Sequence, residues 1–222
     1  MEINFEMLSD TKVLILTVIT VVISYMIGSI NFAIILSKIF KKDDVRKYGS
    51  GNAGMTNMLR IYGILPAALT AIGDFSKGLI SIFIAKFIFY LAGVSDFNPS
   101  YFCALAALLG HLFPVFFGFR GGKGVLTIFG ISLYFSPIIF LILFAIYVPM
   151  AFITRIVSLA SVLGLISYPI CVIAANLISG NNDYQAIVFS IIIVILPLYA
   201  HRENIKRLLN GTENKFGGKP KE

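Results

Sequence analysis

Long apolar stretches separated by short polar segments dominate the chain. The stretches cover approximately residues 12–37, 64–93, 99–117, 125–135, 138–153, 156–179 and 184–200. A helix needs about 20 apolar residues to cross the hydrocarbon layer, so the pattern predicts an all-α integral membrane protein with seven transmembrane helices. A β-barrel is not expected, because its strands alternate polar and apolar residues over segments of about ten.

The charged residues decide the number of crossings. The stretch 125–135 is short for a span at about 1.5 Å per residue, and the alternative is to fuse it with the next stretch across Ser136 and Pro137. With seven crossings nearly all Lys and Arg fall on one side, whereas a fused span would move Arg155 and the basic C-terminal tail to the other. The positive-inside rule therefore predicts an outside N-terminus and a cytoplasmic C-terminus.

The composition agrees with a single membrane domain that covers residues 1–222. Of the 222 residues 58% are hydrophobic and 13% are charged, whereas soluble domains carry about 25% charged residues. The net charge of +7 lies in short segments between apolar stretches, so we expect the bilayer and an anionic molecule as partners and no nucleic acid. Cys103 and Cys171 lie within apolar stretches, where neither a disulfide nor a metal site is predicted.

The first chemically rich segment lies between residues 43 and 60. Gly49, Gly51 and Gly54 spell G-x-G-x-x-G, but an all-helical chain has no βαβ unit, so a dinucleotide site is excluded. Glycines also let successive backbone N–H groups converge on an anion. The candidate substrate ligands are Gly49, Ser50, Gly51, Asn52, Thr56 and Asn57, with Arg46 and Arg60 supplying charge. The alternative is a flexible glycine-rich loop at the membrane surface.

Two further polar segments also combine donors and cations. In the segment 118–124, Gly122 and Gly124 flank Lys123, a good point charge for a phosphate, but Gly124 breaks the Walker A pattern and argues against a nucleoside triphosphate. After the last apolar stretch, His201 and Asn204 lie at i, i+3 on one helix face and are candidate site residues. Positive-inside topology and an interfacial helix end are the plainer explanations of these two segments.

Polar residues within the apolar stretches allow two interpretations. Asp74 and Lys77 form an i, i+3 pair that is either functional or a self-neutralising structural pair. Ser29 and Asn31, near the inner end of the first stretch, are either packing residues or site donors.

Together these segments resemble the bacterial membrane glycerol-3-phosphate acyltransferase family that takes its acyl group from acyl phosphate. The resemblance covers nearly the whole chain and rests on Gly28-Ser-Ile, Arg46-x-x-Gly-Ser-Gly-Asn-x-Gly-x-Thr-Asn-x-x-Arg60, Asp74-x-x-Lys-Gly78, Gly110-His-x-Phe-Pro114, Gly121-Gly-Lys-Gly-Val125 and His201-Arg-x-Asn-Ile-x-Arg-Leu208. The chain departs from the usual Pro, Ala and Ala of this family at Asn31, Met55 and Leu126, positions that concern local helix packing.

The resemblance implies a seven-helix acyltransferase of the bacterial cell (inner) membrane with its site at the cytoplasmic face and no cofactor. The reaction would transfer an acyl group from acyl phosphate to the 1-hydroxyl of glycerol 3-phosphate. The products would be lysophosphatidic acid and phosphate, in the first step of bacterial phospholipid biosynthesis.

That reaction must hold two phosphates side by side. We assign Arg46, with Ser29 and the backbone of Gly49, Ser50 and Gly51, to one phosphate, and Lys123, with Asn204 and His201, to the other. The proton acceptor is either His201 or a phosphate oxygen of the substrate. With two histidines in the chain and no clustered carboxylates or thiolates, no catalytic metal is expected.

A transporter and an inert scaffold are the two alternatives to an enzyme. A transporter of organic phosphates would also need cations and glycine-interrupted backbone, but we would expect its site near the bilayer midplane on discontinuous helices. An inert membrane scaffold would leave three donor-rich segments unexplained. The gathering of these segments at one face favours the enzyme.

Overall fold

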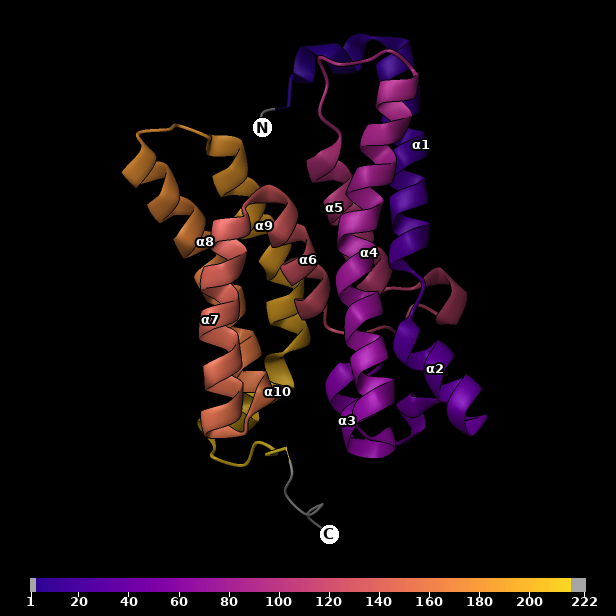
Figure 1. Cartoon of the computed structure of the whole chain (residues 1–222), viewed down its shortest axis with the longest axis vertical. Helices are drawn as coiled ribbons and strands as arrows, with labels where there is room; N and C mark the ends of the chain where they lie inside the picture. Colours follow the sequence, from indigo (N-terminus) through magenta and orange to yellow (C-terminus); the bar gives the residue numbers. More distant parts are fainter. Residues whose placement is uncertain (1–2, 217–222) are drawn as a thin grey trace.

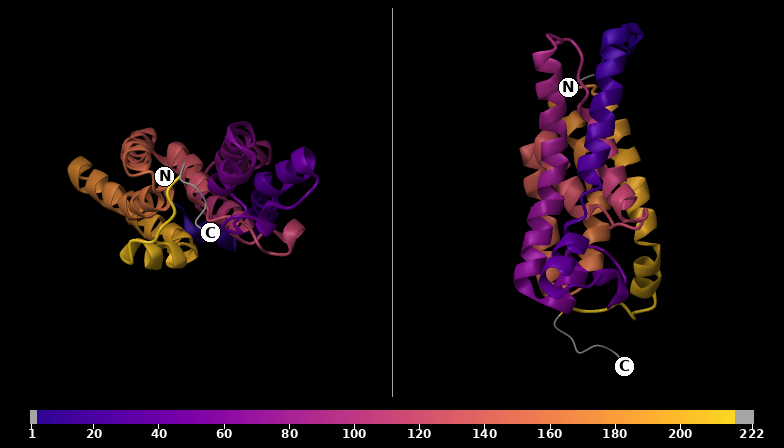
Figure 2. Two further views of the ribbon diagram at one scale, coloured as in Figure 1. Left: turned by 90° about the horizontal axis from the view of Figure 1, so that it is seen from below. Right: turned by 90° about the vertical axis from the view of Figure 1, so that its right-hand side faces the viewer.

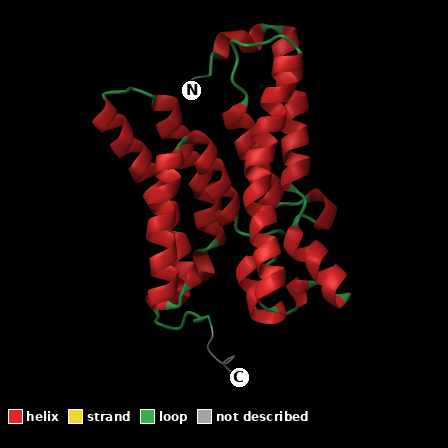
Figure 3. Cartoon of the chain, in the orientation of Figure 1, coloured by secondary structure: helices red, strands yellow, loops and turns green. Residues whose placement is uncertain are grey.

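The computed structural model describes residues 3–216, which form helices joined by short loops, with no strand among them (Figure 3). In chain order the elements are η1 (Phe5–Ser9), α1 (Thr11–Gly28), α2 (Phe32–Lys41), η2 (Val45–Lys47), α3 (Met55–Tyr62), α4 (Ile64–Leu91), α5 (Ser100–Leu112), η3 (Val115–Phe117), α6 (Val125–Phe135), α7 (Pro137–Thr154), α8 (Val157–Ser179), α9 (Tyr184–Ala200) and α10 (Arg202–Leu209). The all-α prediction is confirmed.

Within residues 3–216, five helical segments are long and apolar enough to cross a membrane, and a sixth span arises if α9 and α10 count as one. The five are Thr11–Lys41, which joins α1 and α2, then α4, then Ser100–Phe117, which joins α5 and η3, then α7 and α8. The axes of α9 and α10 differ by 67°. α6 has 11 residues and therefore a length of about 16 Å, which is short of the hydrocarbon thickness. The number of seven crossings stays a prediction.

The first apolar stretch is broken into two helices at residues 29–31. The Ser29 N–H bonds to the Tyr25 carbonyl at 2.8 Å and closes α1. Asn31 then caps α2, because its side-chain oxygen accepts from the Ile34 N–H at 3.0 Å. Asn31, which stands where the family usually has proline, thus serves as the N-cap of α2.

Small residues bring α1 and α5 into close contact. A Cβ added at Gly28 would overlap the Ala107 carbonyl, and one added at Gly110 would overlap the Tyr25 carbonyl. Such close backbone approach is a common way to pack helices in a bilayer, where no hydrophobic force drives them together.

The helices form two groups, α1–α5 and α6–α10, and α6 packs against α4 between them (Figures 1 and 2). η1 and the loop after α4 lie at one end, where the Lys12 ammonium donates to the Ala92 carbonyl at 2.6 Å. The basic elements α2, α3 and α10 lie at the opposite end (Figure 1). The segments with predicted chemistry are thereby brought to one end of the molecule.

Candidate active site

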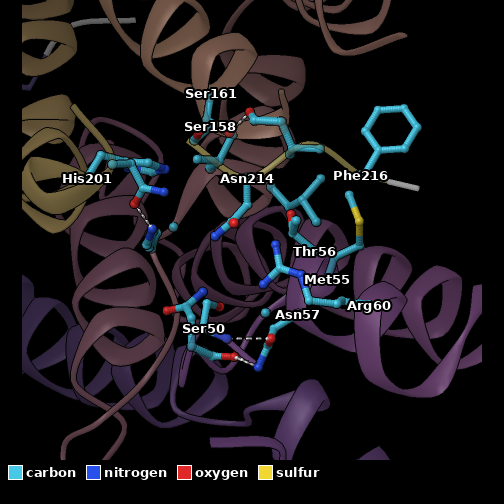
Figure 4. A pocket seen from close by; sticks show the side chains of 18 of the residues that line it. Ser50, Met55, Thr56, Asn57, Arg60, Ser158, Ser161, His201, Asn214 and Phe216 are labelled. Carbon is cyan, nitrogen blue, oxygen red and sulfur yellow. Dashed lines mark hydrogen bonds between the residues drawn. The ribbon is translucent and has the colours of Figure 1, made fainter. Parts of the chain in front are cut away.

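A pocket opens between the two groups of helices near α3 and α10. Its lining includes most of the predicted site residues, namely Ser50, Asn52, Thr56, Asn57, Arg60, Lys123, Gly124, His201 and Asn204. Figure 4 shows His201 and Arg60 on opposite sides of this pocket. The fold thus brings residues of the three polar segments together around one pocket.

Four side chains in the wall of the pocket are joined by hydrogen bonds. The Lys123 ammonium donates to the side-chain oxygen of Asn204. The amide nitrogen of Asn204 donates to Glu213 at 3.0 Å, and the Arg207 Nε donates to the same carboxylate at 2.9 Å. Two cations are therefore placed beside the cavity with one carboxylate between them.

Partial burial changes the chemistry of Lys123. Desolvation lowers the pKa of its ammonium to about 8, and the nearby cations Arg207 and Arg60 act in the same direction, whereas the Glu213 carboxylate opposes the shift. An ammonium with fewer water ligands interacts more strongly with an anion that enters the pocket.

His201 is buried at the junction of α9 and α10. Its Nδ1 lies 2.8 Å from the Pro197 carbonyl, which only accepts hydrogen bonds, so Nδ1 carries the proton and Nε2 of the neutral ring is an acceptor. His201 and Asn204 both line the pocket.

The loop before α3 is organised around the amide of Asn57. Its nitrogen donates to the carbonyls of Val45, Tyr48 and Asn52 at 3.2, 3.0 and 3.1 Å, and its oxygen accepts from the Ser50 N–H at 3.0 Å, a contact visible in Figure 4. The Asn57 amide therefore holds its own loop together, and because Asn57 also lines the pocket, its role as a substrate ligand stays a prediction. The loop presents Ser50 and Asn52 to the cavity, and the first turn of α3 presents Thr56.

Five predicted residues lie outside the pocket lining, namely Ser29, Arg46, Gly49, Gly51 and Gly122. Ser29 is fully buried, and its hydroxyl accepts from the Val115 N–H at 3.4 Å. Gly49 and Gly51 have positive φ angles of 59° and 69° and form the turn around Asn57. The structure thus does not place Ser29, Gly49 and Gly51 together at the pocket.

Arg46 has a different neighbourhood from the predicted one. Its guanidinium binds the Asp44 carboxylate, with Nη2 2.7 Å from Oδ2. Its Nη1 donates to the carbonyls of Phe117 and Arg120 at 2.7 and 3.0 Å. A planar fork with five donors suits this set of acceptors. These contacts tie the loop at 43–48 to the loop at 117–120, and the contact of Arg46 with a phosphate stays a prediction.

Behind the pocket, Gly122 packs against a buried ionic cluster. A Cβ at Gly122 would overlap the His111 imidazole, and His111 Nδ1 lies 3.5 Å from an Asp74 oxygen that is also 2.9 Å from the Lys77 ammonium. Asp74 and His111 reach the lining, whereas Lys77 is enclosed. The buried cluster that contains the Asp74–Lys77 pair therefore also contributes Asp74 and His111 to the wall of the pocket.

Sequence reasoning did not select several polar residues that line the pocket. Ser158 and Ser161 lie in the first two turns of α8 beside Tyr147, and Figure 4 shows both serines at one side of the cavity. Their i, i+3 spacing in an apolar stretch was the available signal. The two residues larger than the usual alanine, Met55 and Leu126, also line the cavity.

Among the described residues, no group of three or more His, Cys, Asp or Glu side chains could hold a metal ion.

The chain is similar to proteins of one family over most of its length. The sequence model of a family described as glycerol-3-phosphate acyltransferase matches residues 18–211. Proteins named glycerol-3-phosphate acyltransferase from Neisseria meningitidis serogroup C and Thermoanaerobacter pseudethanolicus are each 43% identical, over 89% and 91% of this chain and 96% of their own length. Glycerol-3-phosphate acyltransferase 2 from Bacillus anthracis is 41% identical over 90% of this chain and its whole length.

Two crystal structures also match. They are of PlsY (YgiH), described as an integral membrane glycerol 3-phosphate acyltransferase, in a glycerol 3-phosphate form and a lysophosphatidic acid form. The TM-scores are 0.78 and 0.77 at 37% and 36% identity, over 90% of this chain in both and over 96% and 95% of those chains.

Arg46→Lys tests the loop tie. Lysine cannot reproduce the forked contact with Asp44 and both carbonyls, so the variant should lower the free energy of unfolding by about 1–3 kcal/mol. Thermal unfolding of the purified protein in detergent measures this change. The matched control is Arg202→Lys, whose side chain is 52% exposed and should change stability by no more than about 0.5 kcal/mol. Equal losses in the two variants would contradict the loop tie.

Proposed function

We propose that this chain, which belongs to the glycerol-3-phosphate acyltransferase family, transfers an acyl group from acyl phosphate to the 1-hydroxyl of glycerol 3-phosphate. The chain is an acyltransferase and an integral membrane protein by that membership. The observation that carries the finer proposal is the pocket in which Lys123, Arg60 and Arg207 surround one space beside His201 and Asn204. Such a site suits two phosphate-bearing substrates.

The chemistry requires little from protein nucleophiles. The substrate hydroxyl attacks the acyl carbonyl carbon, an ester bond forms, and the bond from that carbon to the phosphate oxygen breaks as phosphate leaves. Proximity and neutralisation of the developing charge supply most of the acceleration for so activated a donor. We assign Lys123, Asn204 and Arg207 to one phosphate and Arg60 with Ser50 and Thr56 to the other. This division replaces Arg46, whose donors are engaged elsewhere.

A substrate phosphate oxygen takes the hydroxyl proton in this proposal. The Nε2 of His201 is free to accept a hydrogen bond, and we assign it to holding the substrate hydroxyl. A phosphate oxygen already lies beside that hydroxyl in a site that gathers two phosphates. No buried protein base is then needed.

We also propose seven crossings of the bacterial cell membrane, with the pocket on the cytoplasmic side. The support is the gathering of α2, α3 and α10, with their lysines and arginines, at the end opposite η1 (Figure 1). α6 would complete the alternation although it is short, because a helix surrounded by other helices need not contact lipid along a full span.

The function is tested with purified protein in lipid. Given acyl phosphate, the protein should release phosphate and form acylglycerol phosphate only when glycerol 3-phosphate is also present. Uptake of glycerol 3-phosphate into sealed vesicles without ester formation would instead support a transporter.

Topology is tested by labelling intact cells with an impermeant thiol reagent. In a background with Cys103 and Cys171 replaced by alanine, cysteines at the exposed residues Asp96 and Asn181 should react from outside. A cysteine at the exposed Lys206 should react only after the cells are opened. Labelling of Lys206→Cys in intact cells would contradict the proposed orientation.

The lowered pKa of Lys123 predicts that kcat/KM falls at alkaline pH, which gives the pH profile an alkaline limb. The ammonium is present below its pKa and is lost as the pH rises through about 8, so kcat/KM for glycerol 3-phosphate should fall above that pH. Lys123→Arg keeps its charge to far higher pH and should remove the limb, even if its activity is lower throughout. Lys206→Arg, at an exposed position of α10, is the control and should keep the limb. A limb that persists in Lys123→Arg would contradict the assignment.

His201→Gln separates the two proton acceptors. If a substrate phosphate takes the proton, the variant should chiefly raise KM, because it loses a hydrogen bond that holds substrate. A fall of about 10²- to 10⁴-fold in kcat with unchanged KM, together with loss of the limb of the pH profile that follows the titration of the His201 imidazole, would make His201 the base instead.

A further inference from the structure

The segment that follows α10 lines the pocket with Glu213, Asn214 and Phe216 and is hydrogen-bonded to other parts of the chain at both ends. The Thr212 N–H donates to the Arg207 carbonyl at 2.8 Å, and the Phe216 N–H donates to the Arg155 carbonyl at 2.8 Å. The Phe216 ring also packs edge-on against Phe152 on α7, with centroids 6.1 Å apart. The segment therefore links α10 to the turn between α7 and α8.

This segment places one carboxylate inside a cationic pocket. The Glu213 side chain is only 7% exposed and accepts hydrogen bonds from both Asn204 and Arg207. Lys123 lies one hydrogen bond further along the same chain of groups. An anion at this position must either compete with the substrate phosphates or arrange the groups that bind them.

The donors and acceptors allow only one arrangement. Lys123 and Arg207 can only donate, and the Glu213 carboxylate can only accept. The Asn204 amide must therefore turn its oxygen to Lys123 and its nitrogen to Glu213. A half-turn of that amide would set its NH₂ group against the ammonium and its oxygen against the carboxylate.

We propose that Glu213 is a positioning residue for the phosphate site, which it arranges by fixing the Asn204 amide and the Arg207 guanidinium. The role rests on the proposed function, because it concerns groups assigned to a substrate phosphate. Glu213 acts through these two neighbours and through the charge that it places near Lys123. It does not contact the reacting atoms.

Glu213→Gln tests this role, because a glutamine cannot accept from Asn204 and Arg207 at the same time without turning its own NH₂ group toward one of the two donors. The variant should raise KM for the phosphate substrates by about tenfold or more while kcat stays within about threefold. It should also move the alkaline limb of kcat/KM to lower pH, because the carboxylate that favours the Lys123 ammonium is gone. A residue that only stabilises the fold would not move that limb.

The matched control is Glu203→Gln on α10. Glu203 is 57% exposed and pairs with Arg202 and Lys206 outside the pocket, so KM and the alkaline limb should both stay at the wild-type values. If Glu213→Gln is not recovered folded, Glu213→Asp serves instead. It keeps the charge but withdraws the carboxylate by one methylene, so KM should rise while the limb stays near its wild-type position.

The outcomes separate this inference from the proposed function. Wild-type protein that forms no ester would contradict the function itself. With active wild-type protein, a folded Glu213→Gln that behaves like Glu203→Gln would overturn the positioning role, and so would an unchanged KM in Glu213→Asp. A lower KM in Glu213→Gln would overturn it as well, since the carboxylate would then be a competitor of phosphate.

Discussion

The site depends on the ammonium group of Lys123, which the fold partly buries and desolvates. Lys123 lies at the start of α6, between two groups of helices, and its hydration is replaced by the Asn204 amide and the nearby Glu213 carboxylate. A charge in such surroundings is costly unless it is paired, and it interacts more strongly with an incoming anion than a charge in bulk water does. The close packing of α6 on α4 and the course of the chain after α10 both serve to hold this group in place.

The loops that carry the other site residues are held by groups that do not reach the substrate space. Asn57 gathers the loop before α3 around its amide, and Arg46 ties that loop to the one that precedes Lys123. On the far side of Gly122, Asp74, Lys77 and His111 form a buried cluster between the helices. Catalysis by proximity requires such rigidity, because misplacement by about 1 Å can cost two orders of magnitude in rate.

The sequence predicted the helices well because bilayer insertion imposes long apolar stretches, and it predicted most of the pocket because glycines and cations cluster within a few residues. It did not predict the partners of Arg46, because the two carbonyl acceptors come from residues 117 and 120, which are distant in the sequence, and nothing in the segment marks Asp44 as the partner. It overlooked Ser158 and Glu213 because neither stands in a glycine-rich segment, and their value arises only when α8 and the chain after α10 meet α3. Contacts between residues distant in sequence carry no local pattern.

Proton uptake on substrate binding tests most directly whether the partly desolvated Lys123 binds phosphate. Calorimetric titration of glycerol 3-phosphate at pH 8.5, in buffers with different ionisation enthalpies, measures this quantity. With a free-enzyme pKa of about 8 for Lys123, binding should draw about half a proton or more per substrate. The Lys123→Arg variant, charged at every pH used, should draw none. Binding without proton uptake by the wild-type protein, or equal uptake by both proteins, would contradict the account.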